Sequence, residues 1–441
     1  MKLIRFELFN TVLRGLRRTL PLAGAVLAAA IATSAQPALA QTWTTDGWGA
    51  TWGTAPAGPP PSTSQQYYSV ANQTVRLIVR TSISGTRVRI RLSNELGTTP
   101  LRIGSANVGL RSSGAAIVAG SGRALTFGGL RSVTIPAGAP ALSDPVSLTV
   151  PAMADLAVSL YLPGTVPVSS LHDLALQTSY VSTPGDFTAS TTIPVQRYIG
   201  WWPLLTEVAV ASSGPVVVAI GDSITDGSRS TSNTNRRWPD YLARRLQAAG
   251  GTNARIGVVN RGIAGNRMLV QTPTNLLAGQ SLANRFGRDV LSTPGVKSVI
   301  VLIGINDIGY SSSSAPVTAA ALIEGYRQLI MRAHSKGISV LGATLLPFEG
   351  AAYYTAAKNG VRQAVNDWIR GSGELDGVID FDAVMRDPSR PTRLLPAYDS
   401  SDHLHPNDLG YQTMGNAVPL TLVSAAAVAP TPVADELSTL P

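Results

Sequence analysis

The sequence predicts an α/β fold with a parallel sheet in its second half, preceded by an all-β region. The apolar runs at 216–220 and 299–303 are rich in β-branched residues and do not alternate with polar ones, which is typical of strands buried on both faces. Segments with apolar residues at helical spacing, such as 322–330 and 361–369, separate these runs from further strands, the last of which is expected at 378–381. Strands that alternate with helices in this way predict a parallel sheet whose functional loops gather at one edge.

Residues 41–212 have the pattern of an antiparallel β region. Val75, Leu77 and Val79 occupy alternate positions, and a second alternating segment follows a Ser-Gly turn, which predicts a hairpin. Short strands separated by Gly, Pro, Asn and Ser clusters predict a β-sandwich, with a jelly roll as one form of it. These further strands are expected at 103–110, 124–127, 133–136, 146–150 and 155–162.

Arginines and tryptophans of the β region have two interpretations each. Arginines interleaved with apolar residues are typical of a solvated strand face, although such a face can also bind an anionic or carbohydrate surface. Tryptophans can stack on sugar rings or pack in a core, and we expect packing. The arginines are Arg76, Arg80, Arg87, Arg89 and Arg91, and the tryptophans are Trp43, Trp48, Trp52, Trp201 and Trp202.

Ser223 is the first candidate for a catalytic group. It follows the buried run 216–220 and Gly221, at the carboxyl end of a strand, where parallel α/β sheets place their chemistry. A serine after a strand is more often a turn or capping residue. Whether Ser223 is a nucleophile therefore depends on whether the chain supplies the partners that a nucleophile needs. A nucleophilic serine needs a base, a group that orients the base, and donors for the developing oxyanion.

A base and its orienting carboxylate are both present in the segment 402–406. Asp402 precedes His405 by three residues, and Pro406 stiffens the turn, so the carboxylate can reach the Nδ1 proton of the imidazole. His403 is an alternative base, with the ordinary role of an exposed loop histidine. We favour His405.

Oxyanion donors are available after two other predicted strands. Asn306 follows the run 299–303 and carries an amide that can donate, although a turn asparagine that caps the next helix has the same pattern. Gly265 lies in a glycine-rich turn after a strand expected at 256–259, where its backbone N–H can approach a ligand closely.

Together these residues resemble the four ordered blocks of the SGNH hydrolases, also called the GDSL esterase/lipase family. The resemblance spans about 216–425 and implies a flavodoxin-like three-layer α/β/α domain. Ile224 stands where the family usually has leucine, which is a conservative apolar change. Several esterases of this family that act on polysaccharides have a β-sandwich ahead of the catalytic domain. The blocks are Gly221-Asp222-Ser223-Ile224, Gly265, Gly304-x-Asn306-Asp307 and Asp402-x-x-His405-Pro406.

The resemblance implies a role for each block. Ser223 would be the nucleophile, His405 the base and Asp402 its partner. The N–H groups of Ser223 and Gly265, with the Asn306 side chain, would form the oxyanion hole. This arrangement implies a serine carboxylic-ester hydrolase that works through an acyl-enzyme and needs no metal and no cofactor.

The first 40 residues have the pattern of an export signal. A basic segment, an apolar stretch at 20–31 and the Ala-Leu-Ala of 38–40 predict cleavage before Gln41 and a periplasmic or extracellular protein with no membrane span afterwards. Adjacent arginines weakly resemble a twin-arginine signal, so the export route stays open. The expected organisation is a signal peptide at 1–40, a β-sandwich at 41–212, the hydrolase domain at 213–427 and a disordered tail at 428–441.

The composition of the chain argues against several functions and kinds of site. The chain has a net charge of +9, but five of its Lys and Arg residues lie in the predicted signal, and no basic cluster suggests nucleic acid. It has no cysteine, which excludes disulfides, thiolate metal sites and a cysteine nucleophile. His172, beside Asp173, is a lone histidine that is expected to lie on the surface or to be hydrogen-bonded. The sequence leaves the oligomeric state open.

The polar loops 228–235 and 311–314 are expected to border the site and favour short acyl groups, such as acetate, on a carbohydrate or other polar carrier. The partner would thus be a small-molecule or polysaccharide ester. Three alternatives stay open: a lipase or lysophospholipase, a carbohydrate-binding or adhesion protein with a relic hydrolase domain, and an acyltransferase that uses the same acyl-enzyme.

Overall fold

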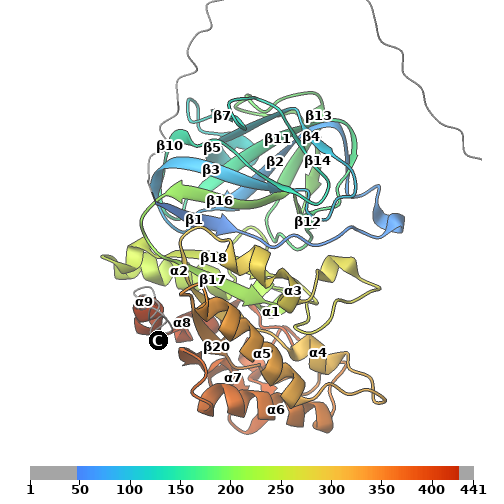
Figure 1. Ribbon diagram of the computed structural model, residues 1–441, viewed down its shortest axis with the longest axis vertical. Coiled ribbons are helices and arrows are strands. Elements are labelled where there is room, and N and C mark those ends of the chain that lie inside the picture. Colours follow the sequence, from blue (N-terminus) through green and yellow to red (C-terminus); the bar gives the residue numbers. More distant parts are fainter. Residues whose placement is uncertain (1–46, 427–441) are drawn as a thin grey trace, which may run out of the picture. The chain divides into compact units, whose positions relative to one another are not determined.

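A five-stranded parallel sheet forms the centre of the second half of the chain (Figure 1). Its strand order is β18-β17-β19-β20-β21, which is 2-1-3-4-5 in chain order and is the flavodoxin-like arrangement. The predicted α/β class is confirmed. The strands are β17 (Val216–Gly221), β18 (Gly257–Gly262), β19 (Val296–Leu302), β20 (Ser339–Ala343) and β21 (Gly377–Ile379).

The computed structural model describes residues 47–426 of the 441-residue chain. The predicted signal peptide at 1–40, Trp43 and the predicted tail at 428–441 lie outside the described residues. The described residues belong to one compact unit, and the domain boundary near 212 stays a prediction.

Strand β17 is buried along its whole length between β18 and β19. In the parallel register, Gly221 lies opposite both Gly262 and Leu302, so the three strands end at the same level. A side chain at Gly221 would place its Cβ 2.2 Å from the carbonyl oxygen of Leu302. Glycine is therefore required where these strand ends converge, directly before the turn that carries Ser223.

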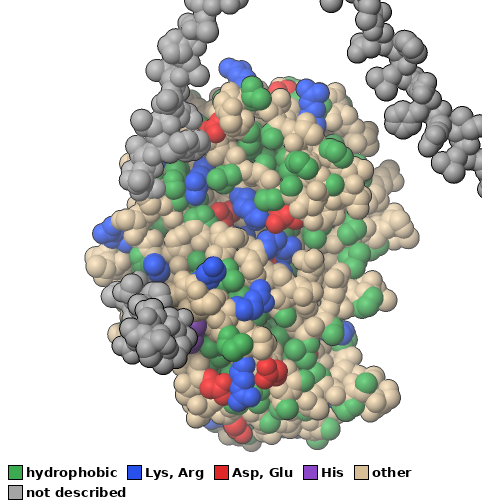
Figure 2. Space-filling view, in the orientation of Figure 1, with side chains coloured by type: hydrophobic (Ala, Val, Ile, Leu, Met, Phe, Trp, Pro, Cys, Tyr) green, Lys and Arg blue, Asp and Glu red, His purple; other side chains and the backbone are tan. Residues whose placement is uncertain are grey.

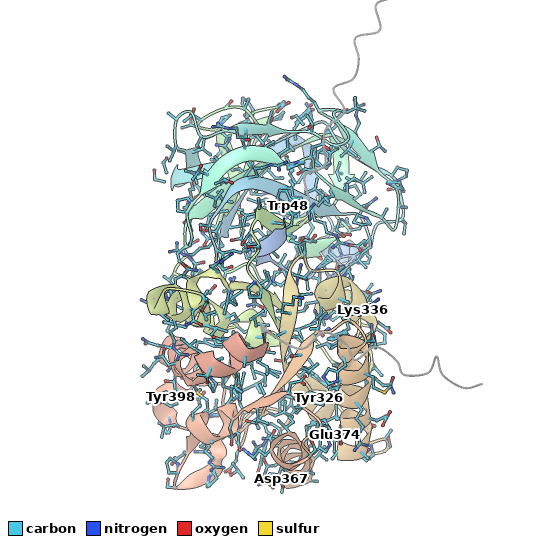
Figure 3. The ribbon with its side chains drawn as sticks, turned by 60° about the vertical axis from the view of Figure 1, so that its left-hand side comes forward. Trp48, Tyr326, Lys336, Asp367, Glu374 and Tyr398 are labelled. Carbon is cyan, nitrogen blue, oxygen red and sulfur yellow. The ribbon has the colours of Figure 1, made fainter. Side chains whose placement is uncertain are left out.

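Two groups of helices pack on the sheet. Helix α2 contacts α8, which contacts α7, whereas α5 contacts α3 and α6. Tyr326 of α5, labelled in Figure 3, is fully buried and donates a 2.7 Å hydrogen bond to the carbonyl oxygen of Ile303. The α-helices are α1 (Ser223–Asp226), α2 (Trp238–Ala249), α3 (Leu282–Phe286), α4 (Ile305–Gly309), α5 (Ala319–His334), α6 (Ala356–Gly371), α7 (Phe381–Met385), α8 (Asp408–Ala417) and α9 (Leu420–Ala426).

Short elements connect the main ones. The two-stranded ribbon of the α/β region is β22 (Arg386–Asp387) with β23 (Arg390–Leu394). Single turns of 3-10 helix are η1 (Ser62–Ser64), η2 (Asn253–Arg255), η3 (Leu276–Ala278) and η5 (Pro396–Tyr398), and η4 (Gly287–Leu291) is a π-helical turn.

Two antiparallel sheets make up most of the chain between 47 and 212. One has the order β1-β16-β3-β10 with β9 beside β3, and the other has the order β14-β13-β2-β11-β5-β6 with β7 beside β5. Leu77 of β2 and Ile90 of β3 belong to the same hydrophobic core, so the two sheets pack face to face as in a β-sandwich.

The five-stranded sheet contains β1 (Trp48–Gly53), β3 (Gly85–Ser93), β9 (Pro140–Leu142), β10 (Val146–Val150) and β16 (Leu205–Ala211). The seven-stranded sheet contains β2 (Ser69–Arg80), β5 (Ser105–Ser113), β6 (Ala116–Ile117), β7 (Arg123–Leu125), β11 (Asp155–Pro167), β13 (Ser179–Pro184) and β14 (Val195–Ile199). Two small pairs are β4 (Leu101–Ile103) with β8 (Val133–Ile135) and β12 (Leu171–His172) with β15 (Trp202–Pro203).

Arg76 differs from the expected solvated arginine, because its side chain is fully buried. The guanidinium donates to Ser159 Oγ at 2.8 Å and to the carbonyl oxygens of Ala115 and Ser190, each at 2.7 Å. A small apolar cluster that includes Ile193 covers the same face of β2. The alternating pattern thus separates the two faces of the strand correctly, but it cannot show that a later loop covers the polar one.

The tryptophans of the β-rich region pack as expected. Trp52, Trp201 and Trp202 are all less than 9% exposed, and the rings of Trp52 and Trp202 meet edge to face at 5.0 Å. Trp48, labelled in Figure 3, is half-buried, and the Arg89 guanidinium lies 4.2 Å from the centre of its ring.

The last predicted strand, at 378–381, ends earlier than expected, at Ile379. Asp380 caps the following helix, with its carboxylate accepting the N–H of Ala383 at 3.2 Å, and Phe381 begins α7. The apolar Phe381 belongs to the helix, which explains why the apolar run appeared longer than the strand.

The β-rich region joins the parallel sheet through hydrogen bonds and one buried ion pair. Ser82 Oγ accepts the N–H of Val258 in β18 at 3.0 Å. Arg261 of β18 lies 2.7 Å from Glu207 of β16, and both side chains are less than 5% exposed. Burial raises the pKa of Glu207 and lowers the pKa of Arg261, and the attraction between the two charges opposes both effects.

The surface carries charge of both signs. On the face shown in Figure 2, basic side chains lie among acidic and uncharged ones. Within residues 47–426, no helix has the length and apolar character needed to cross a membrane.

Replacement of Glu207 by alanine should destabilise the protein by about 3–5 kcal/mol, because it leaves the Arg261 charge buried without its partner. Urea unfolding measures this loss. Glu207→Gln keeps a hydrogen-bond acceptor and should cost less. Glu374→Ala is the matched control, since Glu374 (Figure 3) pairs with Arg327 on the surface and its removal should change stability little. Equal losses for the two alanine variants would contradict this account.

Candidate active site

Ser223 is the first residue of the short helix α1, directly beyond the end of β17. Asp222 precedes it and caps the helix, with its carboxylate accepting the N–H of Ile224 at 3.0 Å. The capping role that a serine could have filled here thus belongs to Asp222. Ser223 is 6% exposed, and its hydroxyl is not used to cap the helix.

His405 connects Ser223 to Asp402. Its Nε2 lies 2.8 Å from Ser223 Oγ, and its Nδ1 lies 2.8 Å from Asp402 Oδ2. The other carboxylate oxygen of Asp402 accepts the N–H groups of His405 and Leu404, at 2.8 and 3.1 Å. Partial burial would raise the pKa of Asp402, but these hydrogen bonds and the His405 ring outweigh it and hold the pKa well below its usual range. Asp402 is therefore an anion that fixes the ring with Nε2 toward the hydroxyl.

His403 takes a different partner. Its Nδ1 lies 2.5 Å from Asp399 Oδ2, and its side chain is 40% exposed. The choice of His405 over His403, which the sequence favoured, agrees with this geometry.

Gly265 and Asn306 follow β18 and β19, the two neighbours of β17, so the aligned strand ends bring them to the edge that carries Ser223. Gly265 has a φ of +77°, a conformation that favours glycine. The Asn306 amide donates one hydrogen bond, of 3.1 Å, to the carbonyl oxygen of Asn266 and retains a second N–H. Within residues 47–426, the N–H groups of Ser223 and Gly265 meet no acceptor.

Buried charged side chains, which the sequence did not single out, hold these turns in place. Asp307 accepts the N–H groups of Met268 and Leu269 at 2.8 and 3.0 Å, and it thereby ties the turn after β18 to the turn after β19. Burial raises the pKa of Asp307, while the same two N–H groups lower it.

Arg285 is the second of these charged side chains. It is 1% exposed and donates to the carbonyl oxygen of Gly221 at 2.9 Å and to Asn266 Oδ1 at 3.0 Å. Burial lowers the pKa of Arg285 to about 10, so the side chain stays charged at neutral pH. Its donors therefore join the strand end before Ser223 to the turn that contains Gly265.

The sequence comparisons identify the domain that contains this site. Residues 219–413 match the model of the GDSL-like Lipase/Acylhydrolase family. The chain carries a GDSL-like lipase/acylhydrolase domain. It is a carboxylic ester hydrolase by class. The comparison with curated proteins returned no match.

Solved structures similar to this GDSL-like domain cover a little under half of the chain. A protein described as lipolytic and of the G-D-S-L family, from Desulfitobacterium hafniense, is 27% identical, with coverage of 46% of this chain and 97% of its own and a TM-score of 0.35. A catalytic mutant of an acetylxylan esterase from Geobacillus stearothermophilus is 22% identical, with coverage of 48% and 95% and a TM-score of 0.36. A GDSL-like lipase from Bacteroides thetaiotaomicron is 20% identical, with coverage of 48% and 88% and a TM-score of 0.33.

The carboxyl group of Asp222, within the first block of the GDSL-like domain, is buried with one oxygen unpartnered. Its Oδ2 has no hydrogen-bond partner among the described residues. Burial raises the pKa of Asp222 to about 7, and the nearby Asp307 carboxylate adds to the rise. Near neutral pH a large share of this carboxyl group is therefore protonated, which lessens the cost of burying it beside Asp307.

The loop 228–235 contacts the segment that carries His405. Arg229, which has a φ of +74°, donates to Asp402 Oδ2 at 3.2 Å from a largely exposed position. Thr231 and Arg236 both bond to the carboxylate of Asp408. The sequence predicted that this loop borders the site, but it gave no signal for the contact between Arg229 and Asp402, which spans 173 positions.

Two cavities border the turns of the GDSL-like domain. One, of about 210 Å³, is lined by residues of both regions, among them Asp173, Asp226, Ala264 and Asn275. The second, of about 390 Å³, is lined by Ser311–Ser313, by Thr355 and Lys358, and by apolar side chains that include Ile308 of α4. The serine run thus lines a cavity beside the element that carries Asn306. In the described part of the chain, no group of three His, Cys, Asp or Glu side chains is placed to hold a metal ion.

The two histidines of the 402–406 segment should differ in their importance for ester hydrolysis. His405→Gln should lower kcat for p-nitrophenyl acetate on the order of 10⁴-fold, because it removes the group that faces Ser223 Oγ. His403→Gln, the matched control, should keep kcat near the wild-type value. The reverse order of effects would overturn the choice of His405.

Proposed function

We propose that Ser223, His405 and Asp402 act as a catalytic triad that hydrolyses carboxylic esters through an acyl-enzyme. The supporting observation is the pair of 2.8 Å contacts on the two sides of the His405 ring, to Ser223 Oγ and to Asp402 Oδ2. A neutral His405 whose Nδ1–H donates to Asp402 has its Nε2 lone pair directed at the serine hydroxyl.

In the first half-reaction, Ser223 Oγ attacks the ester carbonyl carbon while His405 Nε2 accepts the hydroxyl proton. Negative charge develops on the carbonyl oxygen, where the N–H groups of Ser223 and Gly265 and the second amide N–H of Asn306 would receive it. The tetrahedral intermediate collapses, and the alcohol leaves with the proton from His405. The acyl group remains on Ser223.

In the second half-reaction, water takes the place of the alcohol. His405 accepts a proton from the water as its oxygen attacks the acyl carbon, and the same donors stabilise the second oxyanion. Collapse releases the carboxylic acid and returns the proton to Ser223 Oγ. Asp402 remains an anion throughout and stabilises the imidazolium that forms in each half-reaction.

We propose a short acyl group, such as acetyl, on a carbohydrate or another polar carrier. The support is the polar character of the surroundings: the cavity lined by Ala264 offers Asp173 and Asn275, and the polar loop 228–235 contacts Asp402 through Arg229. Export of the mature enzyme is part of the same proposal and is supported by the basic and apolar pattern of residues 1–40. A chain recovered only inside the cell and still carrying those residues would contradict it.

A second candidate function is hydrolysis of esters with longer acyl chains, as in a lipase. The observation that favours it is the larger cavity beside α4, whose lining includes Ile308, Pro316, Val317 and Val361. The preference for acyl length separates the two candidates.

The first test compares p-nitrophenyl acetate, butyrate and decanoate as substrates of the chain that begins at Gln41. We expect kcat/KM to fall from acetate to decanoate, and Ser223→Ala to lower kcat on the order of 10⁴-fold or more while the fold, followed by circular dichroism, is retained.

Most of the wild-type activity remaining in Ser223→Ala would overturn the mechanism. A rise of kcat/KM from acetate to decanoate would keep the mechanism and select the lipase candidate instead.

A further inference from the structure

His172 is buried at the contact between the β-rich region and the GDSL-like domain. It ends β12, is 3% exposed, and its ring lies 5.7 Å from that of Trp202 with an angle of 31° between the planes. Nδ1 lies 3.0 Å from the carbonyl oxygen of Ala55, and Nε2 lies 3.0 Å from Asp226 Oδ1 and 3.2 Å from the carbonyl oxygen of Leu174.

All three partners of the His172 ring are hydrogen-bond acceptors. A neutral imidazole carries a proton on only one nitrogen, and the other would then place a lone pair against an oxygen lone pair. With Asp226 ionised, both ring nitrogens donate, which makes His172 an imidazolium. The carboxylate of Asp226, 4% exposed, is its counter-ion.

Asp226 links this imidazolium to the turn after β18. It is the last residue of α1, the helix that begins with Ser223, and its second oxygen accepts the N–H of Ala264 at 2.9 Å. Ala264 directly precedes Gly265. One carboxylate therefore joins His172, the helix of the candidate nucleophile and the turn of a candidate oxyanion donor.

We propose that His172 is a positioning residue of the ester-hydrolase site, which fixes Asp226 so that its second oxygen holds Ala264 and directs the Gly265 N–H toward the reacting carbonyl oxygen. This inference rests on the proposed function for the role of Gly265. It makes the β-rich region part of the hydrolytic machinery, because His172 and Ala55 both precede residues 219–413, which match the family model.

The physical reason is the sensitivity of an oxyanion hole to donor geometry. Removal of one donor costs about 10²–10³ in turnover, and a displacement of about 1 Å can cost about 10². His172, Asp226 and Ala264 line the same cavity. Without the imidazolium, the buried Asp226 carboxylate would therefore face this cavity without a cationic partner. The carboxylate would then rotate toward another donor or bind water, and Ala264 would lose its fixed partner.

The charge on His172 depends on the groups that face it. Burial lowers the pKa of His172, but the charge and hydrogen bond of Asp226 and the carbonyl oxygen of Ala55 outweigh burial, so the pKa is raised; Arg237 opposes the rise. Arg80 and Asp240 line a small cavity on the same side, and Asp173 is the next residue of the chain. Because the pKa of His172 is higher in the folded protein than in the unfolded chain, its protonation stabilises the fold. This stabilisation is complete below pH about 6.5, the ordinary pKa of histidine, and it is lost as the pH rises through the folded-state pKa.

The test uses His172→Gln, which keeps a polar side chain and removes the charge. With p-nitrophenyl acetate at pH 7, we expect kcat to fall on the order of 10- to 10²-fold with little change in KM, since the donor acts on the transition state more than on the bound ester. His172→Gln combined with Asp226→Asn should cost less than the product of the two separate losses, because the residues act as one unit.

Two control variants separate positioning from a general loss of stability. His334→Gln removes a histidine paired with a carboxylate, Asp376, on the surface of the GDSL-like domain. Arg76→Met removes a buried cation that bonds only within the β-rich region. Both should retain the wild-type kcat at 25 °C, even where Arg76→Met lowers the melting temperature.

Hydrogen–deuterium exchange gives a readout that does not require activity. In His172→Gln, the amides of residues 262–266 should exchange faster than in the wild type, and in both controls they should not. Unchanged exchange, an unchanged kcat, or an equal loss of kcat in Arg76→Met would each overturn the proposal. If the wild type lacks hydrolysis that depends on Ser223, the proposed function fails, and the exchange result still decides whether His172 holds the turn.

Discussion

The parallel register of β18, β17 and β19 is the constraint on which the candidate site depends. The three strands end at the same level, so the turns that follow them carry Ser223, Gly265 and Asn306 to one edge of the sheet. This register requires close contact between strand ends, which Gly221 permits, and a β17 that is apolar throughout. His405 then needs only one loop, the segment before α8, to reach the same edge.

Buried charged side chains fix the turns that follow these strands. Arg285, Asp307 and Asp226 each bond to backbone groups of the turns rather than to solvent. Each such charge is expensive to bury, and hydrogen bonds from or to the backbone offset that cost only in one geometry. Displacement of the turns would break these hydrogen bonds and leave the buried charges without partners, so it is unfavourable. A preorganised oxyanion hole requires such fixed turns.

Local sequence patterns could predict the α/β class and the strand ends that carry Ser223 and Asn306, because these follow from apolar runs and glycine turns. The choice of His405 over His403 also needed the family resemblance. The sequence could not predict the burial of Arg76 or the link from His172 to Asp226. These contacts join segments far apart in the chain, and their residue types are equally common on solvated surfaces. The contact of Arg229 with Asp402 was missed for the same reason.

The most direct test of the central claim is covalent labelling of the nucleophile by a fluorophosphonate, followed by mass spectrometry of the intact protein and its peptides. The account predicts one adduct per chain, located on Ser223, which forms much more slowly in His405→Gln because the hydroxyl then lacks its base. An adduct on another residue, or labelling that proceeds unchanged in Ser223→Ala, would contradict the account.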